Sequence, residues 1–176
     1  MSIDEQQGRR VVARGSGQLR HSLELYRPGL TKPALVCQGC LVNVPDWFAG
    51  LTSPLDDKMG TEWIEVTPTR AVARCPVEGN TQPFGLWHGG ASCVLAEGLA
   101  SMAAAADVGP EGTVTGVDLN ATHLRSARSG WITGTATAIR IGNTLATYDV
   151  DLIDDHGNQI CAARVTVYLR RARQAE

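Results

Sequence analysis

The sequence carries little net charge, few cysteines and no long hydrophobic run that is free of charge. The formal net charge is −2 and the pI is near 6.1, so no general attraction to nucleic acid or to an anionic membrane is expected. The longest apolar stretch, residues 89–106, contains Glu97 and many small residues, which does not favour a membrane span. The first residues lack a basic-then-apolar signal sequence. We therefore predict a cytoplasmic protein that binds neither nucleic acid nor membrane.

The cysteines are odd in number and scattered along the chain. This usage argues against a disulfide framework and favours a reducing compartment. Cys37 and Cys40 form a lone Cys-x-x-Cys pair, but a zinc site needs two further ligands close by. Cys75, Cys93 and Cys161 are typical of core or strand positions instead. We expect no metal and no cofactor.

The length of 176 residues fits one domain with a hydrophobic core and some additional chain. Residues 1–44 are expected to form an N-terminal extension, partly disordered because its first half is polar and aperiodic, with a short helix over residues 21–26. Residues 45–172 form the predicted domain, and residues 173–176 a tail. No internal repeat is present.

Helices and strands can be assigned from residue 45 onward. A short helix is expected over residues 46–51 with Asp46 as its N-cap, and a long helix from residue 89 to about 107. Gly142-Asn143 is a two-residue hairpin signal, and residues 154–158 form a longer turn. Strands are predicted at residues 61–67, 70–75, 113–124, 131–141, 144–153 and 159–170. Because their connections are too short for crossovers, the strands should be antiparallel, which predicts an α+β fold with the sheet wrapped around one long central helix.

Glu97 is the only charged residue in the long helix up to residue 106. A helix that is apolar or small on every face is expected to be buried all round. A carboxylate inside it is costly unless it is paired or used, and burial would raise its pKa, as is common at functional sites. The alternative is a carboxylate that reaches solvent or pairs with an arginine.

The start of the long helix offers a site for negative charge. Backbone N–H groups are free at a helix N-terminus and the helix dipole favours an anion there. Gly89 and Gly90 follow His88, and glycine lets a ligand approach the backbone. Alternatively, the glycines only permit tight packing and His88 only caps the helix. Ser101 lies four residues after Glu97, on the same face of the helix, where its hydroxyl could hold a water molecule or the carboxylate. Alternatively, Ser101 is a small core residue whose hydroxyl bonds back to the helix backbone.

Three segments, residues 82–92, 95–97 and 120–128, resemble the acyl-CoA thioesterases of the PaaI type, which have the hotdog fold. Within that group they are most similar to the 1,4-dihydroxy-2-naphthoyl-CoA hydrolases of menaquinone biosynthesis. The combination of Gln82 six residues before His88 and Glu97 nine residues after it is the specific part of the pattern. The similarity spans roughly residues 45–170 and says nothing about the residues before them.

The resemblance implies a hydrolase that cleaves an aromatic acyl-CoA to the free acid and coenzyme A. It implies that the Gly89 N–H donates to the thioester oxygen and that Gln82 contacts the reacting centre. Glu97 would act either as the nucleophile or as the base that activates water. His88 would position the Gly89 loop, and Ser101 would hold the water or the carboxylate.

The resemblance also implies where the rest of the substrate binds. Arg125, Ser126 and Arg128 would hold the phosphates of coenzyme A, although rim arginines are often plain surface charges. His123 would lie in the acyl pocket near the catalytic glutamate of a second copy. A satisfied core histidine, on a strand face shared with Val117, Leu119 and Ala121, is the competing interpretation. The implied assembly is a homodimer or a homotetramer.

Other readings of the same residues remain open. Asp118, Asn120 and His123 echo a motif of hotdog enoyl-CoA hydratases, but here the motif lies on the strand after the helix. A non-catalytic acyl-CoA sensor on the same fold would keep the arginines and lose the carboxylate.

Trp87 stands where members of the resembled family carry a smaller aliphatic residue, so the acyl group could be bicyclic, phenylacetyl-like or broader.

Overall fold

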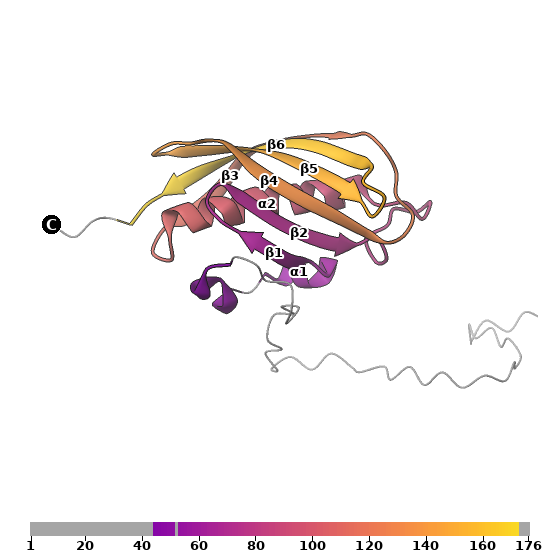
Figure 1. The fold of residues 1–176 in the computed structure, drawn as a ribbon, viewed down its shortest axis with the longest axis horizontal. Helices are drawn as coiled ribbons and strands as arrows, with labels where there is room; N and C mark the ends of the chain where they lie inside the picture. Colours follow the sequence, from indigo (N-terminus) through magenta and orange to yellow (C-terminus); the bar gives the residue numbers. More distant parts are fainter. Residues whose placement is uncertain (1–43, 52, 173–176) are drawn as a thin grey trace, which may run out of the picture. The chain divides into compact units, whose positions relative to one another are not determined.

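In the part of the chain that the structure describes, six antiparallel strands form one sheet that curves around one long helix (Figure 1). The computed structural model describes residues 44–51 and 53–172. Predictions about residues 1–43, which include the helix at 21–26 and the pair Cys37 and Cys40, lie outside the described residues, as does the tail at 173–176. The α+β architecture is confirmed, with one helix against one antiparallel sheet.

The elements follow one another as predicted, with one addition near the start. In chain order they are η1 (Asp46–Gly50), α1 (Pro54–Met59), β1 (Glu62–Val66), β2 (Arg70–Pro76), α2 (Gly89–Val108), β3 (Thr113–His123), β4 (Trp131–Ile141), β5 (Leu145–Asp154) and β6 (Gln159–Arg170). Each of the four strands after α2 begins and ends within one residue of its predicted bounds. Of the two turns, Gly157 (φ 77°) closes the later one as expected, while the earlier one reverses at residues 143–144, with the Gly142 N–H donating to the Leu145 carbonyl (2.9 Å).

One local prediction near the start of the domain needs correction, and one helix was not predicted. Pro45, not Asp46, occupies the N-cap of η1, and no side chain caps this 3-10 helix. Helix α1 was not expected, although its sequence carries the signals. Ser53 accepts a hydrogen bond from the Asp56 N–H (3.3 Å), Pro54 occupies the first turn, and Gly60 ends the helix in the left-handed conformation (φ 67°), a combination typical of short capped helices.

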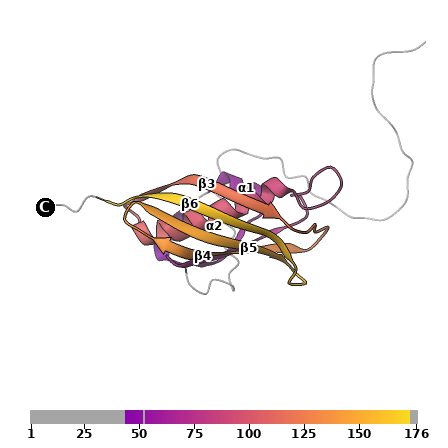
Figure 2. The ribbon, with the colours of Figure 1, turned by 90° about the horizontal axis from the view of Figure 1, so that it is seen from above.

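The strand order is β1-β2-β4-β5-β6-β3, so β3 lies at one edge of the sheet although it follows α2 directly. Figures 1 and 2 show β3 beside β6, with α2 on the concave face. Among the described strands, β3 pairs only with β6. Its other edge carries unpaired backbone groups, a liability that proteins usually cover. The register of β3 shifts between Gly116 and Asp118, and Val117, in this bulge, is 61% exposed.

Helix α2 is covered on one side only, which overturns the prediction that it is buried all round. Leu95, Ala96, Leu99 and Ala100 are buried in the core, whereas Glu97 is exposed. The physical reason is that a single curved sheet reaches only part of a helix circumference, and small residues on the remaining faces do not imply contact. By length and composition α2 could also cross a membrane; here it contacts every strand of the sheet.

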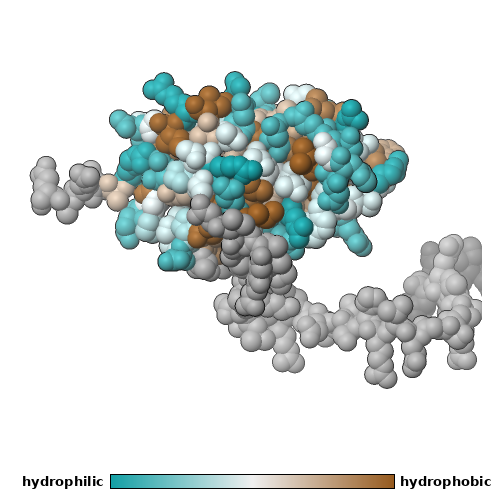
Figure 3. Space-filling view, viewed as in Figure 1, coloured by the Kyte–Doolittle hydropathy of each residue, from teal (hydrophilic) through white to brown (hydrophobic). Residues whose placement is uncertain are grey.

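The outer surface is mixed in character. On the face seen in Figure 3, hydrophobic residues form separate patches among hydrophilic ones. Exposed large hydrophobic side chains are spread over several elements and include Ile139, Leu145 and Tyr168. Isolated exposed apolar residues of this kind are common on folded proteins and need no partner.

The approach of β4 to α2 depends on Gly134. A methyl group added there would lie 2.5 Å from Leu99 Cδ1 and 3.3 Å from Leu95 Cγ. We expect Gly134→Ala to lower the free energy of unfolding by about 1–3 kcal/mol through overpacking, measured by urea denaturation. Thr137→Val, on an exposed position of the same strand, should change it by less than about 0.5 kcal/mol; equal effects of the two variants would contradict this account.

Candidate functional site

The N-terminus of α2 leaves one backbone donor free. His88 is the N-cap, and its Nδ1 accepts a hydrogen bond from the Gly90 N–H (2.8 Å). The His88 carbonyl accepts from the N–H groups of Ala91 (2.9 Å) and Ser92 (3.3 Å). Within residues 44–51 and 53–172, the Gly89 N–H makes no hydrogen bond. Gly89 therefore presents the unsatisfied donor of the helix start, at its positive end.

His123 lies directly over Gly89. A methyl group added at Gly89 would come within 2.8 Å of His123 Nε2 and 3.1 Å of the ring carbons Cδ2 and Cε1. Gly89 is not among the glycines with a positive φ, so its backbone conformation does not demand glycine. The space for the imidazole demands it instead. The predicted residues Gly89 and His123 are thus brought together within one chain.

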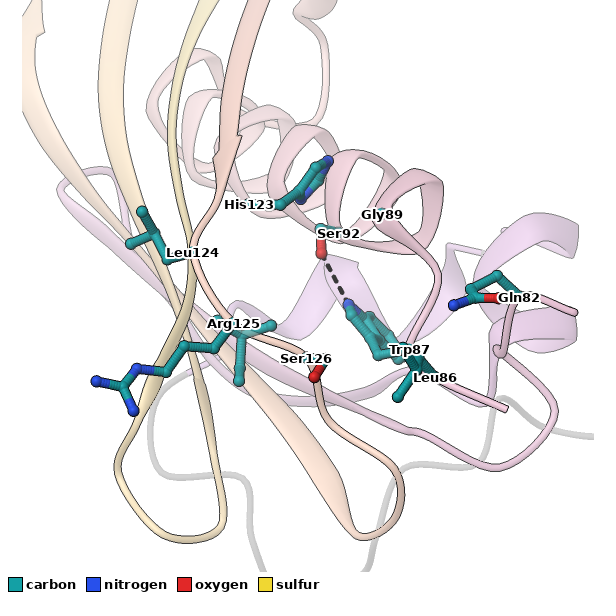
Figure 4. A pocket seen from close by; sticks show the side chains of 10 residues that line it. Gln82, Leu86, Trp87, Gly89, Ser92, His123, Leu124, Arg125 and Ser126 are labelled. Carbon is teal, nitrogen blue, oxygen red and sulfur yellow. Dashed lines mark hydrogen bonds between the residues drawn. The ribbon is translucent and has the colours of Figure 1, made fainter. Parts of the chain in front are cut away.

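A pocket of about 400 Å³ opens beside Gly89, a volume typical of small-molecule sites. Figure 4 shows its side chains, which come from the loop before α2, the start of α2, the end of β3 and the segment after it, and β6. The residues that line it are Gln82, Leu86, Trp87, Gly89, Ser92, His123, Leu124, Arg125, Ser126 and Ile160. Five of these were predicted as site residues, and Trp87 was considered for its effect on the acyl group. Leu86, Ser92, Leu124 and Ile160 were not predicted.

Gln82 is oriented by the loop in which it lies. Its side-chain oxygen Oε1 accepts a hydrogen bond from the Phe84 N–H (2.6 Å). The backbone N–H of Gln82 donates to the Leu86 carbonyl (2.8 Å). Because the amide oxygen is engaged, the –NH₂ group is left to donate. In Figure 4 this nitrogen points to the side on which Trp87 lies. The pocket therefore has a second hydrogen-bond donor in addition to the Gly89 N–H.

The segment after β3 is pinned on both sides. The N–H groups of Leu124 and Arg125 donate to the Ile160 carbonyl (2.8 and 3.3 Å), and the Ala127 carbonyl accepts from the Trp87 N–H (2.8 Å). Arg125 is exposed, and in Figure 4 its guanidinium group extends away from Gln82 and Trp87. It therefore lies at the rim of the pocket and not at its floor.

Two predicted residues of this segment differ in their relation to the pocket. Ser126 lines it, whereas Arg128 is exposed and is not a lining residue. Gly90 and His88, at the helix start, are likewise exposed and outside the lining set. His88 caps the start of α2 through the Gly90 N–H, and Arg128 follows Ser126 by two residues.

Trp87 and Ser92 form a buried polar pair in the pocket wall. The indole Nε1 donates to Ser92 Oγ (2.7 Å), and the two residues are 6% and 0% exposed. Sequence reasoning noted Trp87 but missed Ser92. The only available signal was a hydroxyl in the first turn of an otherwise apolar helix, which also fits an ordinary helix residue.

Glu97 and Ser101 lie away from the pocket. Glu97 follows Gly89 by eight residues, which is about 12 Å along an α-helix, and its carboxylate lies beside Gly116 of β3. Ser101 is half-buried one turn further along. The structure thus separates the predicted catalytic residues of one chain into two groups, one at the helix start and one at its middle.

Cys75 and Cys161, two of the cysteines in the described residues, do not supply a nucleophile. Burial raises the pKa of the Cys75 thiol to about 11 and also raises the pKa of Cys161. Both thiols are fully buried in strands, as predicted, and stay protonated at neutral pH, so they are inert. The part of the chain that the structure describes contains no group of three or more His, Cys, Asp or Glu side chains that could hold a metal ion.

The Trp87–Ser92 pair can be tested by a double-mutant cycle. Trp87→Phe should destabilise the fold by about 1–3 kcal/mol because it leaves a buried hydroxyl without its donor, and the smaller ring adds a cavity cost. In urea denaturation, the double variant with Ser92→Ala should cost less than the sum of the two single variants. Strict additivity would show that the hydrogen bond contributes nothing.

The chain is similar to several known proteins. Residues 84–161, which include the start of α2, His123 and Glu97, match the model of the thioesterase superfamily. The chain is 37% identical over 121 residues to a 1,4-dihydroxy-2-naphthoyl-CoA hydrolase of Listeria monocytogenes, covering 68% of this chain and 98% of that protein. It is 40% identical over 95 residues to the enzyme of the same name from Escherichia coli, covering 53% and 70% respectively.

Solved structures show the same fold. A glutamine-to-alanine variant of a thioesterase from Pseudomonas aeruginosa is 36% identical, with a TM-score of 0.67 over 76% of this chain and 99% of that one. A thioesterase from Haemophilus influenzae is 31% identical, with a TM-score of 0.65 over 71% and 88%. These matches confirm the hotdog fold and the family that the motifs predicted. The chain belongs to the thioesterase superfamily, and it is a thioester hydrolase.

Proposed function

We propose that the protein hydrolyses an aromatic acyl-CoA, of the 1,4-dihydroxy-2-naphthoyl-CoA kind, to the free acid and coenzyme A. The observation that carries this proposal is that Gly89, whose N–H makes no hydrogen bond at the positive end of α2, lines one pocket together with Gln82. Relatives that are 37% and 40% identical carry the name of that hydrolase, which supports the substrate class.

The two donors suit the charge that develops during thioester cleavage. When the carbonyl carbon becomes tetrahedral, its oxygen takes up negative charge that preorganised N–H groups stabilise. The Gly89 N–H and the Gln82 –NH₂ group supply two such donors from different segments. His88 contributes indirectly, since its Nδ1 occupies the neighbouring Gly90 N–H and holds the helix start in place.

The reaction balances with water as the only co-reactant. The water oxygen bonds to the carbonyl carbon, the C–S bond breaks, and the sulfur leaves with the electron pair and takes a proton. Glu97 either accepts the proton of the attacking water or attacks the carbonyl itself and forms an anhydride that water then hydrolyses. Because a thiol has a pKa of about 8.5, the thiolate of coenzyme A can leave without a strong general acid.

A separation of about 12 Å along one helix is too large for Glu97 and the Gly89 N–H of one chain to act on the same carbon. A second copy resolves this. If two copies pair through the free edge of β3 about a two-fold axis, the half of one strand that carries Gly116 lies against the half of the other that ends at His123. Glu97 of one copy then faces Gly89 of the other, and the pairing covers the open strand edge.

The assembly that follows is a homodimer with two composite sites. Each site takes Gln82, Gly89 and His123 from one copy and Glu97 with Ser101 from the other. Two such dimers would give a homotetramer. This arrangement also explains why Glu97 is exposed in the single chain, since the open face of α2 is where the second copy packs.

Coenzyme A is held from the rim of the pocket. Arg125 extends to solvent beside Ser126 (Figure 4), and Arg128 is exposed nearby. Guanidinium groups bind phosphates in bidentate fashion, so this rim suits the phosphates while the thioester reaches inward to Gly89. The inner wall is apolar, with Leu86, Trp87 and Ile160, which favours an aromatic group near the thioester.

Replacing the carboxylate by an amide tests its role in the chemistry. We expect Glu97→Gln to lower turnover of the preferred CoA thioester by about two orders of magnitude or more, because an amide neither attacks the carbonyl nor takes a proton. Thiol release would be followed with dihydroxynaphthoyl-, benzoyl-, phenylacetyl-, hexanoyl- and palmitoyl-CoA. Glu111→Gln, an exposed residue after α2, is the charge-matched control; unchanged turnover in Glu97→Gln would overturn the proposal.

Mixing two inactive variants tests the composite site. Gln82→Ala should lower kcat by about 10²–10³-fold through loss of one oxyanion donor. Co-expression of Gln82→Ala and Glu97→Gln copies should restore about a quarter of wild-type turnover, because half of the dimers are mixed and one of their two sites is intact. Each variant co-expressed with itself is the control. No recovery in mixed dimers, verified by two affinity tags, would place all the residues of one site in one chain.

A further inference from the structure

Gly116 of β3 lies against the carboxylate of Glu97. A methyl group added at Gly116 would come within 2.5 Å of Glu97 Oε1, 3.4 Å of Cδ and 3.7 Å of Cγ. These three nearest atoms all belong to the one side chain. The space that a Cβ atom would fill at this position is therefore occupied by the proposed catalytic carboxylate.

The backbone at Gly116 does not require glycine. The residue is absent from the glycines with positive φ, so its conformation is open to any amino acid. Packing against the core does not require it either, in contrast to Gly134, where an added methyl group would meet Leu99 and Leu95. The requirement that remains at Gly116 is room for the Glu97 side chain.

The neighbouring bulge contributes to this arrangement. The register of β3 shifts between Gly116 and Asp118, which turns Val117 outward, 61% exposed. Before the bulge, Gly116 faces α2 at Glu97; after it, Leu119 and Ala121 again pack against the core, and His123 reaches Gly89. Bulges often occur next to active sites, where they re-aim side chains. One edge strand thus contacts both groups of site residues.

We propose that Gly116 is a positioning residue for Glu97, whose missing side chain fixes where the carboxylate lies. The inference rests on the proposed catalytic role of Glu97. A side chain at residue 116 would displace the Glu97 carboxylate from its position beside β3. Misplacement of a reacting group by about 1 Å costs roughly 10²-fold in rate. The cost to folding is small, because only the end of a flexible, exposed side chain has to move.

The test is Gly116→Ala, measured alone and combined with Glu97→Gln. In the wild-type background we expect kcat to fall by at least about ten-fold with little change in KM, an unchanged or slightly higher urea midpoint, and the same mass by light scattering. In the Glu97→Gln background the added methyl group should cause no further loss of residual turnover. Thr115→Val, on the preceding exposed position of β3, is the control and should leave kcat unchanged.

The outcomes separate the two proposals. Full turnover in Glu97→Gln would remove the catalytic role of Glu97 and the basis of the inference. With that role intact, three results would each overturn the positioning role: unchanged kcat in Gly116→Ala, a loss that is equally large in the Glu97→Gln background, or a loss that accompanies unfolding or dissociation to monomers. A kcat loss that vanishes in the double variant supports it.

Discussion

The packing of α2 against a single curved sheet is the constraint on which the other features depend. The face of α2 toward the sheet carries buried residues such as Leu95, Ala96, Leu99 and Ala103. The close approach of β4 at Gly134 sets the distance between the helix and the sheet. Since the sheet covers one side only, the opposite side stays open. Glu97 lies on the open side, and the free N-terminus of the helix opens into the pocket.

The site depends on how α2 is aligned with β3. The strand runs back along the helix, so that His123 lies over Gly89 at the helix start and Gly116 lies over Glu97 two turns later. In both pairs a glycine on one element gives room to a functional side chain on the other. This alignment fixes the donor and the carboxylate relative to the edge strand, and a symmetric contact through that edge can then bring them together from two copies.

Hydrophobic alternation and turn residues were sufficient to predict the six strands, the long helix and the antiparallel sheet, because these depend on local spacing. The motif around His88 predicted the pocket residues Gln82 and Gly89. The environment of Glu97 could not be predicted in the same way, since small residues are compatible with burial and with an open face alike. Val117 was placed on the inner face by strict alternation, and the bulge that turns it outward has no sequence signal of its own.

The two glycines that accommodate His123 and Glu97 set stability against activity. Neither glycine has a left-handed backbone. If positions for substitution were chosen by backbone geometry alone, both glycines would be considered replaceable. Alanine in place of a glycine with a permissive backbone commonly stabilises a protein by about 0.4–1 kcal/mol through the entropy of the unfolded chain. At Gly116 that gain would come with displacement of the carboxylate. On the proposed role of Glu97, a Gly116→Ala substitution chosen to raise thermostability would therefore lower the activity of the enzyme.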